Sequence, residues 1–326
     1  MTSTSPLSAI LISTPGAGAP TVSERTWRVL RGRRRLDWWL RAASPTPRLL
    51  TAASLLLDGW SLPGLRDAFS GGRFASAVLD PAEMAVLNTI AGHTWDHPSM
   101  PDAVRLELPD WLLAPLQAHF GSALAAEIAA LSEEAPLDLR VNVLKTTREQ
   151  AQAALAGEGW DARPTRLSPW GLRIEGRRPV TTGPTFQHGL VEIQDEGSQL
   201  VALMVGAEPG MRIVDLCAGA GGKTLALAST MQNRGQIVAC DVSAPRLEGA
   251  VRRLRRAGVH NVERHLLAPG DKWAKRRGGS FDRVLVDAPC TGTGTWRRNP
   301  DARLRLLPSD LAELQAKQSA ILDLAQ

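Results

Sequence analysis

Residues 214–224 read Val214-Asp215-Leu216-Cys217-Ala218-Gly219-Ala220-Gly221-Gly222-Lys223-Thr224, between an apolar strand pattern and a helical pattern that runs to Met231. A buried strand, a glycine turn and a helix in this order are typical of an α/β domain with a doubly wound parallel sheet, which binds ligands where its strands end. Glycines let the backbone approach a ligand closely, and the helix N-terminus offers unpaired amide groups. The stretch therefore predicts a ligand-binding loop, with a purely structural glycine turn as the alternative.

Two familiar glycine motifs do not fit this loop. A phosphate-binding loop that ends in Gly222-Lys223-Thr224 needs a glycine where Cys217 stands. The dinucleotide fingerprint needs its third glycine where Thr224 stands. The sequence therefore argues against a nucleoside triphosphate site and against a nicotinamide-dependent dehydrogenase.

Strand and helix patterns alternate after this loop. Strand patterns cover 236–240, 261–267 and 281–286, and a helical pattern opened by Pro245 lies between the first two. Such alternation predicts a parallel sheet with right-handed crossover connections. A further helical pattern covers 309–325.

Polar residues follow each predicted strand. Asp241 follows the second strand and is placed to accept hydrogen bonds from the ribose hydroxyls of a nucleoside-containing cofactor. Asp271, in the loop after the third strand, is either a contact to an adenine edge or a solvated loop acid. Asp287 and Cys290 follow the fourth strand in Asp287-Ala288-Pro289-Cys290-Thr291-Gly292-Thr293-Gly294. A buried structural thiol is the alternative for Cys290, but the neighbouring carboxylate and glycines favour a reactive residue.

The rest of the chain divides by composition. Residues 1–22 carry no charge, are rich in Ser, Thr, Pro, Gly and Ala, and predict a disordered tail. Residues 23–133 show helical patterns separated by Pro and Gly and predict an all-helical domain. Residues 134–193 combine short strand patterns with one helix over 148–157, which predicts a small α+β module. Residues 194–326 then form the α/β domain.

Composition limits the environment and the partners. Three well-separated cysteines in 326 residues cannot form a disulfide framework, so we expect a reducing, cytoplasmic compartment. We expect no membrane span, because no apolar run approaches the ~20 residues that a span needs, and we expect no metal. The net charge is +5, and residues 24–42, with seven arginines and two acids, account for all of it. This arginine cluster favours an RNA or DNA partner, with a solvated helix face as the alternative.

These motifs together resemble the RsmB/Sun-type ribosomal RNA cytosine methyltransferases. The resemblance covers nearly the whole chain after residue 22. It is carried by Asp215–Thr224, by Asp241 and by Asp287–Gly294 with the following Trp296-Arg297-Arg298-Asn299-Pro300-Asp301. Arg140–Thr147 and Gln194–Gln199 also match segments of the family. The commoner family form has Pro at the position of Ala220, a change that we expect to be tolerated.

The resemblance implies a multidomain fold and a set of partners. It implies a NusB-like RNA-binding domain over 23–133, an RRM-like module over 134–193 and a Rossmann-like methyltransferase domain over 194–326. The resemblance implies RNA of the small ribosomal subunit as the substrate and S-adenosylmethionine as the cofactor. The implied cofactor-binding residues are Cys217, Ala218, Gly219, Ala220, Gly221, Gly222, Lys223, Asp241, Asp271 and Asp287.

The resemblance also implies a covalent mechanism at carbon 5 of cytosine. In the family one cysteine adds to carbon 6 of the base, and a second, in the Pro-Cys motif, helps release the methylated product. Cys290 matches the second, and Asp287 would hydrogen-bond the base or the cofactor. The first lies in a Thr-Cys-Ser motif that these 326 residues do not contain. We therefore expect a truncated, inactive form with an incomplete sheet and an exposed apolar edge at Val284–Val286, and the alternative is a non-catalytic RNA-binding protein.

Overall fold

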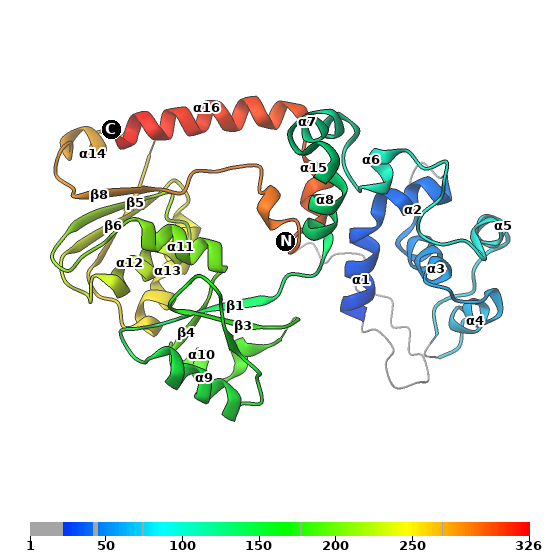
Figure 1. Cartoon of the computed structure of the whole chain (residues 1–326), viewed down its shortest axis with the longest axis horizontal. Helices are drawn as coiled ribbons and strands as arrows, with labels where there is room; N and C mark the ends of the chain where they lie inside the picture. The colour runs from blue at the N-terminus through cyan, green and yellow to red at the C-terminus, as the bar shows by residue number, and fades with distance from the viewer. Residues whose placement is uncertain (1–21, 42–44, 74, 177, 269) are drawn as a thin grey trace. The chain divides into compact units, whose positions relative to one another are not determined.

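The computed structural model describes residues 22–41, 45–73, 75–176, 178–268 and 270–326. The tail expected over 1–22 lies outside the described residues, except for Val22, which begins the first helix. The chain forms two compact units, which Figure 1 draws in colours that follow the chain. Unit 1 comprises Met1–Glu133 and Gly292–Pro308, and unit 2 comprises Glu134–Thr291 and Ser309–Gln326.

Unit 1 is helical throughout its described residues, as the sequence predicts. Several helices begin at residues that cap them: the Thr46 side chain accepts a hydrogen bond from the amide of Leu49, and Asp80 with Glu83 forms a capping box. The helices are α1 (Val22–Arg31), α2 (Arg33–Leu40), α3 (Pro47–Leu57), α4 (Leu62–Ala68), α5 (Pro81–Ile90), α6 (Asp102–Arg105), α7 (Asp110–Phe120), α8 (Leu124–Ser132) and α15 (Pro300–Arg305).

The main core of unit 1 lies between the helices of its first seventy described residues. Helix α3 is buried along almost its whole length, and Leu36, Leu65 and Leu87 contribute fully buried side chains from the helices around it. Trp95 joins this core and passes close to Gly32, between α1 and α2. A Cβ atom at Gly32 would lie 2.2 Å from the Trp95 ring, so this approach requires glycine.

The segment 292–308 belongs to unit 1, which differs from the continuous domain over 194–326 expected from the sequence. Trp296 is 1% exposed and packs in one cluster with Leu108 and Leu124 of the helical region. Arg303, equally buried, stacks over the Trp296 ring and donates a hydrogen bond to the Ser132 hydroxyl at 3.1 Å. The physical reason is burial: this segment fills an apolar cluster that α7 and α8 leave open.

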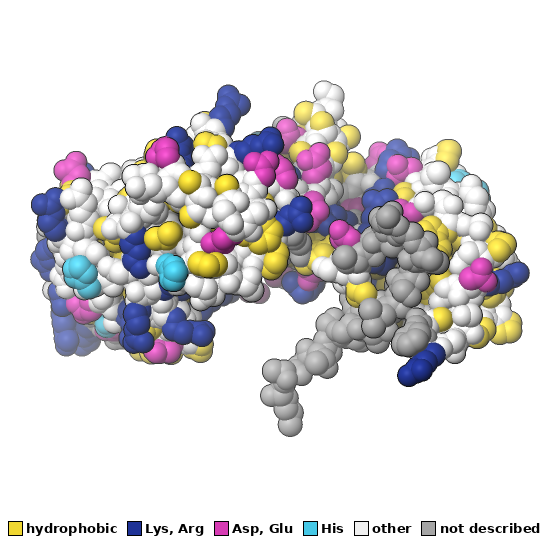
Figure 2. All heavy atoms as spheres, turned by 90° about the horizontal axis from the view of Figure 1, so that it is seen from below, with side chains coloured by type: hydrophobic (Ala, Val, Ile, Leu, Met, Phe, Trp, Pro, Cys, Tyr) yellow, Lys and Arg dark blue, Asp and Glu magenta, His cyan; other side chains and the backbone are white. Residues whose placement is uncertain are grey.

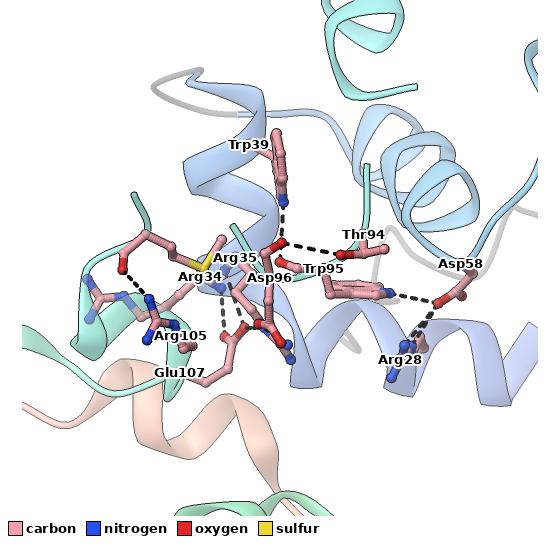
Figure 3. A network of polar contacts seen from close by, with 11 residues as sticks. Arg28, Arg34, Arg35, Trp39, Asp58, Thr94, Trp95, Asp96, Arg105 and Glu107 are labelled. Atoms are coloured by element: carbon pink, nitrogen blue, oxygen red, sulfur yellow. Dashed lines mark hydrogen bonds and ion pairs between the residues drawn. The ribbon is translucent and has the colours of Figure 1, made fainter. Parts of the chain in front are cut away.

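Most arginines of the cluster in α1 and α2 form ion pairs with acids of unit 1. Figure 3 shows part of this network, in which Asp58 accepts hydrogen bonds from Arg28 and from the Trp95 indole. Five of the arginines form ion pairs with carboxylates, namely Arg25 and Arg28 with Asp58, Arg33 with Asp37, Arg34 with Asp110, and Arg35 with Asp96 and Glu107. The local positive excess counted along the sequence is therefore mostly balanced by acids that folding brings in. This finding weakens the hypothesis that the cluster is a phosphate-binding surface.

Unit 2 begins with a four-stranded antiparallel sheet, here called the antiparallel module (residues 134–193). The strand order is β2-β3-β1-β4, with β2 at one edge. One face of this sheet is apolar, and Leu139, Leu172 and Leu155 are fully buried there. Its elements are β1 (Leu137–Val141), α9 (Arg148–Gly157), β2 (Arg163–Pro164), β3 (Gly171–Ile174), α10 (Pro184–Gln187) and β4 (Val191–Ile193).

The second sheet of unit 2 is parallel, with strand order β7-β6-β5-β8. Neighbouring residues in a strand point to opposite faces, so Ile213 and Ile237 pack under α12 and α13, whereas Val214 and Val238 pack toward α14. The predicted alternation of strands and helices is confirmed. The elements are α11 (Glu196–Met204), β5 (Arg212–Leu216), α12 (Gly222–Thr230), β6 (Gln236–Asp241), α13 (Ala244–Ala257), β7 (Val262–Leu266), α14 (Trp273–Arg276), β8 (Arg283–Val286) and α16 (Pro308–Ala325).

Strand β8 lies at one edge of the parallel sheet, as expected. Its side chains differ in exposure: Val284 is 40% exposed, whereas Leu285 is 6% exposed and packs into the core. The exposed apolar edge expected over Val284–Val286 is therefore interrupted by the buried Leu285. Among the described helices, none is both long and apolar enough to cross a bilayer.

The ion pair between Arg35 and Glu107 yields a test of what stabilises unit 1. Glu107 is 3% exposed, and burial raises the pKa of its carboxyl against the lowering effect of Arg35. Replacing Arg35 with Ala leaves this carboxylate buried without its cation, so we expect the free energy of unfolding to fall by about 3 kcal/mol. The exposed pair Arg105–Asp102 supplies the control, since Arg105→Ala should cost less than ~1 kcal/mol. Urea titrations followed by tryptophan fluorescence measure both, and equal losses would contradict the prediction.

Candidate functional site

The predicted site residues meet at one edge of the parallel sheet. Strands β5, β6, β7 and β8 run parallel, so their carboxyl ends lie along a common edge. The glycine loop (residues 217–221) follows β5, Asp241 ends β6, and Asp287 follows β8. The structure thus brings together residues that are 72 positions apart in the sequence, from Asp215 to Asp287.

The glycine loop turns sharply into α12. Cys217, Gly219 and Gly221 all have positive φ values, of 62°, 58° and 78°. The amide of Ala218 donates to the Cys240 carbonyl at 2.9 Å, which fastens the loop to β6. A Cβ atom at Gly219 would meet no atom within 4 Å, so open space lies over this backbone. No side chain caps α12, and the first amides of a helix lack intrahelical partners.

Asp241 fixes the shape of the glycine loop. Its side chain is 3% exposed, and one carboxylate oxygen accepts a hydrogen bond from the Gly219 amide at 2.8 Å. The other oxygen accepts from the Ser243 amide, also at 2.8 Å. Each oxygen retains a second lone pair. In the structure Asp241 therefore first organises the backbone of the loop, a role that the expected contact with ribose did not include.

Asp215 is a site residue that the sequence analysis did not single out. It is 0% exposed at the end of β5, and the Thr224 hydroxyl donates a hydrogen bond of 2.6 Å to one of its oxygens. The other oxygen has no hydrogen-bond partner among the described residues. Burial raises the pKa of this carboxyl to about 6. The sequence did contain a signal for this role. An acid, Asp215, stands in an apolar strand pattern, and a threonine, Thr224, follows the glycines in the first turn of the helix.

Asp287 and Cys290 form the exposed part of the site. The Asp287 side chain is 51% exposed, and the Lys223 ammonium at the start of α12 pairs with it. Cys290 is exposed, and the neighbouring Pro289 carbonyl accepts a hydrogen bond of 2.8 Å from Gln318 of α16. Exposure of Cys290 argues against the alternative of a buried structural thiol at that position.

The other two cysteines have a different character. Cys240 is 0% exposed, and burial raises the pKa of its thiol to about 12, so it is protonated and inert. Cys217 lies at an intermediate depth, and burial together with Asp241, Asp215 and Asp287 raises the pKa of its thiol. Cys290 is therefore the one exposed thiol of the three.

Asp271 lies near the same edge, after β7, but its side chain is occupied. One oxygen is 2.7 Å from the His265 ring nitrogen and the other accepts from the Trp273 amide at 2.8 Å. The hydrogen bond with His265 lowers the pKa of this carboxyl. In the structure Asp271 orders its own loop, and the second lone pair on each oxygen leaves the expected contact to an adenine edge as a prediction.

The antiparallel module holds the glycine loop from outside. Arg140 of β1 is 2% exposed, and its guanidinium donates a hydrogen bond of 2.8 Å to the Gly222 carbonyl. Arg253 of α13 donates one of 2.8 Å to the Ala220 carbonyl. Glu192 of β4 accepts hydrogen bonds from Arg253 and from Arg256. Arg140 lies in a motif of the sequence, but its role was not predictable from that motif, because its partner lies 82 residues away.

The raised pKa of Asp215 predicts a pH-dependent stability. Because the folded pKa of about 6 lies above the ordinary value of 3.8, the folded state binds the proton more tightly than the unfolded chain. The stabilisation is complete below about pH 4 and is lost as the pH rises through 6, by on the order of 3 kcal/mol. Asp215→Asn cannot ionise and still accepts from Thr224, so it should remove this loss.

Urea unfolding followed by circular dichroism, from about pH 4 to about pH 7.5, measures this effect. Asp161→Asn is the control, because the Asp161 side chain is 75% exposed. The control should keep the dependence of the unmodified chain. If the Asp215→Asn variant shows the same dependence of unfolding free energy on pH as the unmodified chain, the prediction for this carboxyl is wrong.

Two family models match the chain, and one of the two matched regions includes this site. Residues 202–326 match the model described as 16S rRNA methyltransferase RsmB/F. Residues 108–181 match the RsmF/B-like ferredoxin-like domain, which covers α7, α8 and the antiparallel module as far as β3. The segment that matches the methyltransferase model therefore includes both the site and helix α16.

A curated relative and two solved structures are similar to the chain. Ribosomal RNA small subunit methyltransferase B of Photorhabdus laumondii is 35% identical over 220 residues, which cover 66% of this chain and 50% of that protein. The crystal structure of PH0851 shares the fold, with a TM-score of 0.75, 24% identity, and coverage of 93% of this chain and 73% of the other. A methyltransferase homologue from Pyrococcus horikoshii has a TM-score of 0.60 and 28% identity, and covers 71% and 73%.

The chain spans about half the length of the curated relatives it matches. The matched segment 202–326 nevertheless carries the glycine loop, Asp241, Asp287 and Cys290 in the order that the resemblance implied. Residues 108–181 and 202–326 therefore place the chain in the RsmB/F methyltransferase family.

Proposed function

We propose that the glycine loop and the strand ends around it bind S-adenosylmethionine. The observation that carries this proposal is the open space over Gly219, bordered by the uncapped start of α12. Free helix amides suit the carboxylate of an amino-acid group, and the Asp241 lone pairs suit hydroxyl donors. When bound, this cofactor supplies an electrophilic methyl group. The residues that would hold it are Cys217, Ala218, Gly219, Ala220, Gly221, Gly222, Lys223, Asp241, Asp271 and Asp287.

A matched pair of glycine variants tests cofactor binding. Gly219→Ala places a methyl group in the open space and should weaken the affinity for S-adenosylmethionine at least ten-fold. Gly206 also has a positive φ, of 63°, and nothing within 4 Å of its Cβ position, but it lies after α11, away from the strand ends. Gly206→Ala therefore bears the same backbone cost, of about 1 kcal/mol. Isothermal calorimetry should show an unchanged Kd for Gly206→Ala, and equal affinities for the two variants would overturn the assignment.

The reaction proposed for the whole protein is methylation of carbon 5 of a cytosine in small-subunit ribosomal RNA. It is supported by the family models and by the curated relative, a small-subunit ribosomal RNA methyltransferase. Carbon 5 is a poor nucleophile until a thiolate adds to carbon 6. Asp287, which pairs with Lys223, would hydrogen-bond the base edge or the cofactor. Cys290, the exposed thiol beside it, takes the role of releasing the product.

We further propose that the helical residues 23–133 and the module over 134–193 contribute RNA-binding surfaces in this protein, as NusB-like and RRM-like domains, and that the protein acts in the cytoplasm. The arrangement of buried Arg140 against the glycine loop supports a joint role for the antiparallel module and the cofactor site.

The 326-residue chain allows a direct test of the assigned roles. The sequence contains no Thr-Cys-Ser motif, so we propose that the chain by itself binds cofactor and RNA without turnover. Incubation with labelled S-adenosylmethionine and unmodified small-subunit ribosomal RNA, followed by nucleoside mass spectrometry, should yield no 5-methylcytidine. Stoichiometric product would show that Cys290 or another group acts as the nucleophile, and it would contradict the alternative of a non-catalytic RNA-binding protein that retains the cofactor site.

A further inference from the structure

The polar face of the antiparallel sheet is not available to a nucleic acid. Asp138, Arg140 and Glu192 lie on this face and are 3%, 2% and 7% exposed. Asp138 accepts hydrogen bonds from Arg173 and from the Glu196 amide, while Arg140 and Glu192 bind the glycine loop and α13. A base therefore cannot stack on this face, and any RNA contact of the module has to lie elsewhere.

A pocket opens at the edge of the same sheet, beside β2. Its volume is about 600 Å³, which lies within the range of sites that hold molecules of nucleotide size. Trp160, from the turn after α9, lines it together with four arginines, Arg163, Arg166, Arg173 and Arg178. Two acids, Asp161 and Glu175, also line it, so the pocket is basic overall.

The four arginines of the pocket differ in whether they form ion pairs or hydrogen bonds with other residues. Arg163 pairs with Asp161 at 2.8 Å, and Arg173 binds both oxygens of Asp138 at 2.7 and 2.9 Å. Arg166 and Arg178 are exposed, and neither has an ion pair or hydrogen bond with another described residue. These two guanidinium groups are therefore the ones with donors to offer to a ligand.

Trp160 provides a fixed aromatic surface next to these charges. Its side chain is partly buried and packs against the core of the module, which holds the ring in place. Its indole nitrogen has no hydrogen-bond partner among the described residues. Aromatic rings beside cationic side chains are the usual means of holding single-stranded RNA, since bases stack on the ring and phosphates pair with the cations.

We propose that this pocket binds one nucleotide of the RNA substrate, with the base on Trp160 and the phosphates on Arg166 and Arg178. The inference rests on the proposed function for its RNA partner and adds a contact point outside the methylation site. Figure 2 shows basic side chains interspersed with acidic ones on the face of unit 2 that it presents. The pocket differs from a general basic surface because it combines unpaired arginines with an aromatic ring.

The charge contribution is tested by removing the two unpaired arginines. The probe is a short fluorescein-labelled single-stranded RNA of cytidines and uridines, titrated with the 326-residue chain at several salt concentrations. Arg166→Ala with Arg178→Ala should reduce the log–log salt slope by about 1.4, because two phosphate contacts are lost at about 0.7 each. The control pair, Arg66→Ala with Arg252→Ala, removes two other exposed arginines and should leave the slope unchanged. Equal slopes in the two double variants would overturn the proposal.

The aromatic contribution is tested at Trp160. Trp160→Phe keeps a stacking surface and should bind the RNA almost normally, whereas Trp160→Ala should bind roughly ten-fold more weakly. Thermal unfolding of both variants identifies any loss of RNA affinity that is due to impaired folding alone. A Phe variant that binds the RNA as weakly as the Ala variant would overturn the stacking role.

Photocrosslinking locates the contact directly. When the unmodified chain is irradiated with RNA that contains 4-thiouridine, the RNA should become attached to peptides within residues 159–178. Crosslinks confined to other regions would overturn the site.

Two further outcomes separate this inference from the proposed function. RNA binding that is insensitive to every pocket variant overturns the pocket and leaves the methyltransferase assignment intact. A chain that binds S-adenosylmethionine but no RNA overturns both the pocket and the RNA partner.

A competition experiment tests whether the pocket recognises a nucleotide. Cytidine 5′-monophosphate should compete with the labelled RNA more strongly than a glutamate-rich peptide of higher charge. Equal competition would mean an unspecific anion site and would overturn the proposal.

Discussion

The hydrogen bonds from the backbone amides of Gly219 and Ser243 to the buried carboxylate of Asp241 hold the functional edge of the parallel sheet together. A carboxylate with 3% exposure is costly to bury, and two charge-assisted hydrogen bonds offset that cost. One bond fixes the glycine loop after β5, and the other fixes the turn that leads into α13. Together with the hydrogen bond from the Ala218 amide to the Cys240 carbonyl, this side chain sets the position of the loop relative to β6, and with it the space over Gly219.

The antiparallel module supports the same loop from the other side. Arg140 donates to the Gly222 carbonyl, and Glu192 binds Arg253, which in turn donates to the Ala220 carbonyl. Arg140 and Glu192 are almost fully buried, so each requires its partner, and the loss of one would leave an unpaired charge. The module thus uses its polar sheet face to fix the methyltransferase domain. Its RNA contacts are consequently left to the edge of the sheet, where Trp160 lies.

Arginine serves two different purposes in this chain. In unit 1, Arg25 and Arg28 bind the carboxylate of Asp58, which follows α3, and Arg35 binds that of Glu107, which follows α6. These ion pairs stabilise the packing of α1 and α2. In the pocket beside β2, Arg166 and Arg178 keep their donors unpaired. Both places are rich in arginine, so charge along the sequence does not separate a structural arginine from one that is free to bind. The difference arises from which carboxylates the fold brings within reach.

The sequence by itself determined the local elements. The order of strands, the glycine loop and the acids at strand ends follow from hydrophobic periodicity and from turn residues, which act over a few positions. Element limits agree with the structure to within a few residues, as for the helix Arg148–Gly157, whose limits are unchanged. The family resemblance rests on these same short motifs.

Only the tertiary structure decided how distant residues are used. It assigned Gly292–Pro308 to unit 1 because Trp296 and Arg303 are buried there, and it gave Arg140 a partner 82 residues away. It also buried Asp215 and Cys240 and left Cys290 exposed. Burial and long-range pairing depend on the whole packed chain, because the free energy of each contact includes the desolvation of groups that are far apart in sequence. A local pattern therefore cannot contain that information.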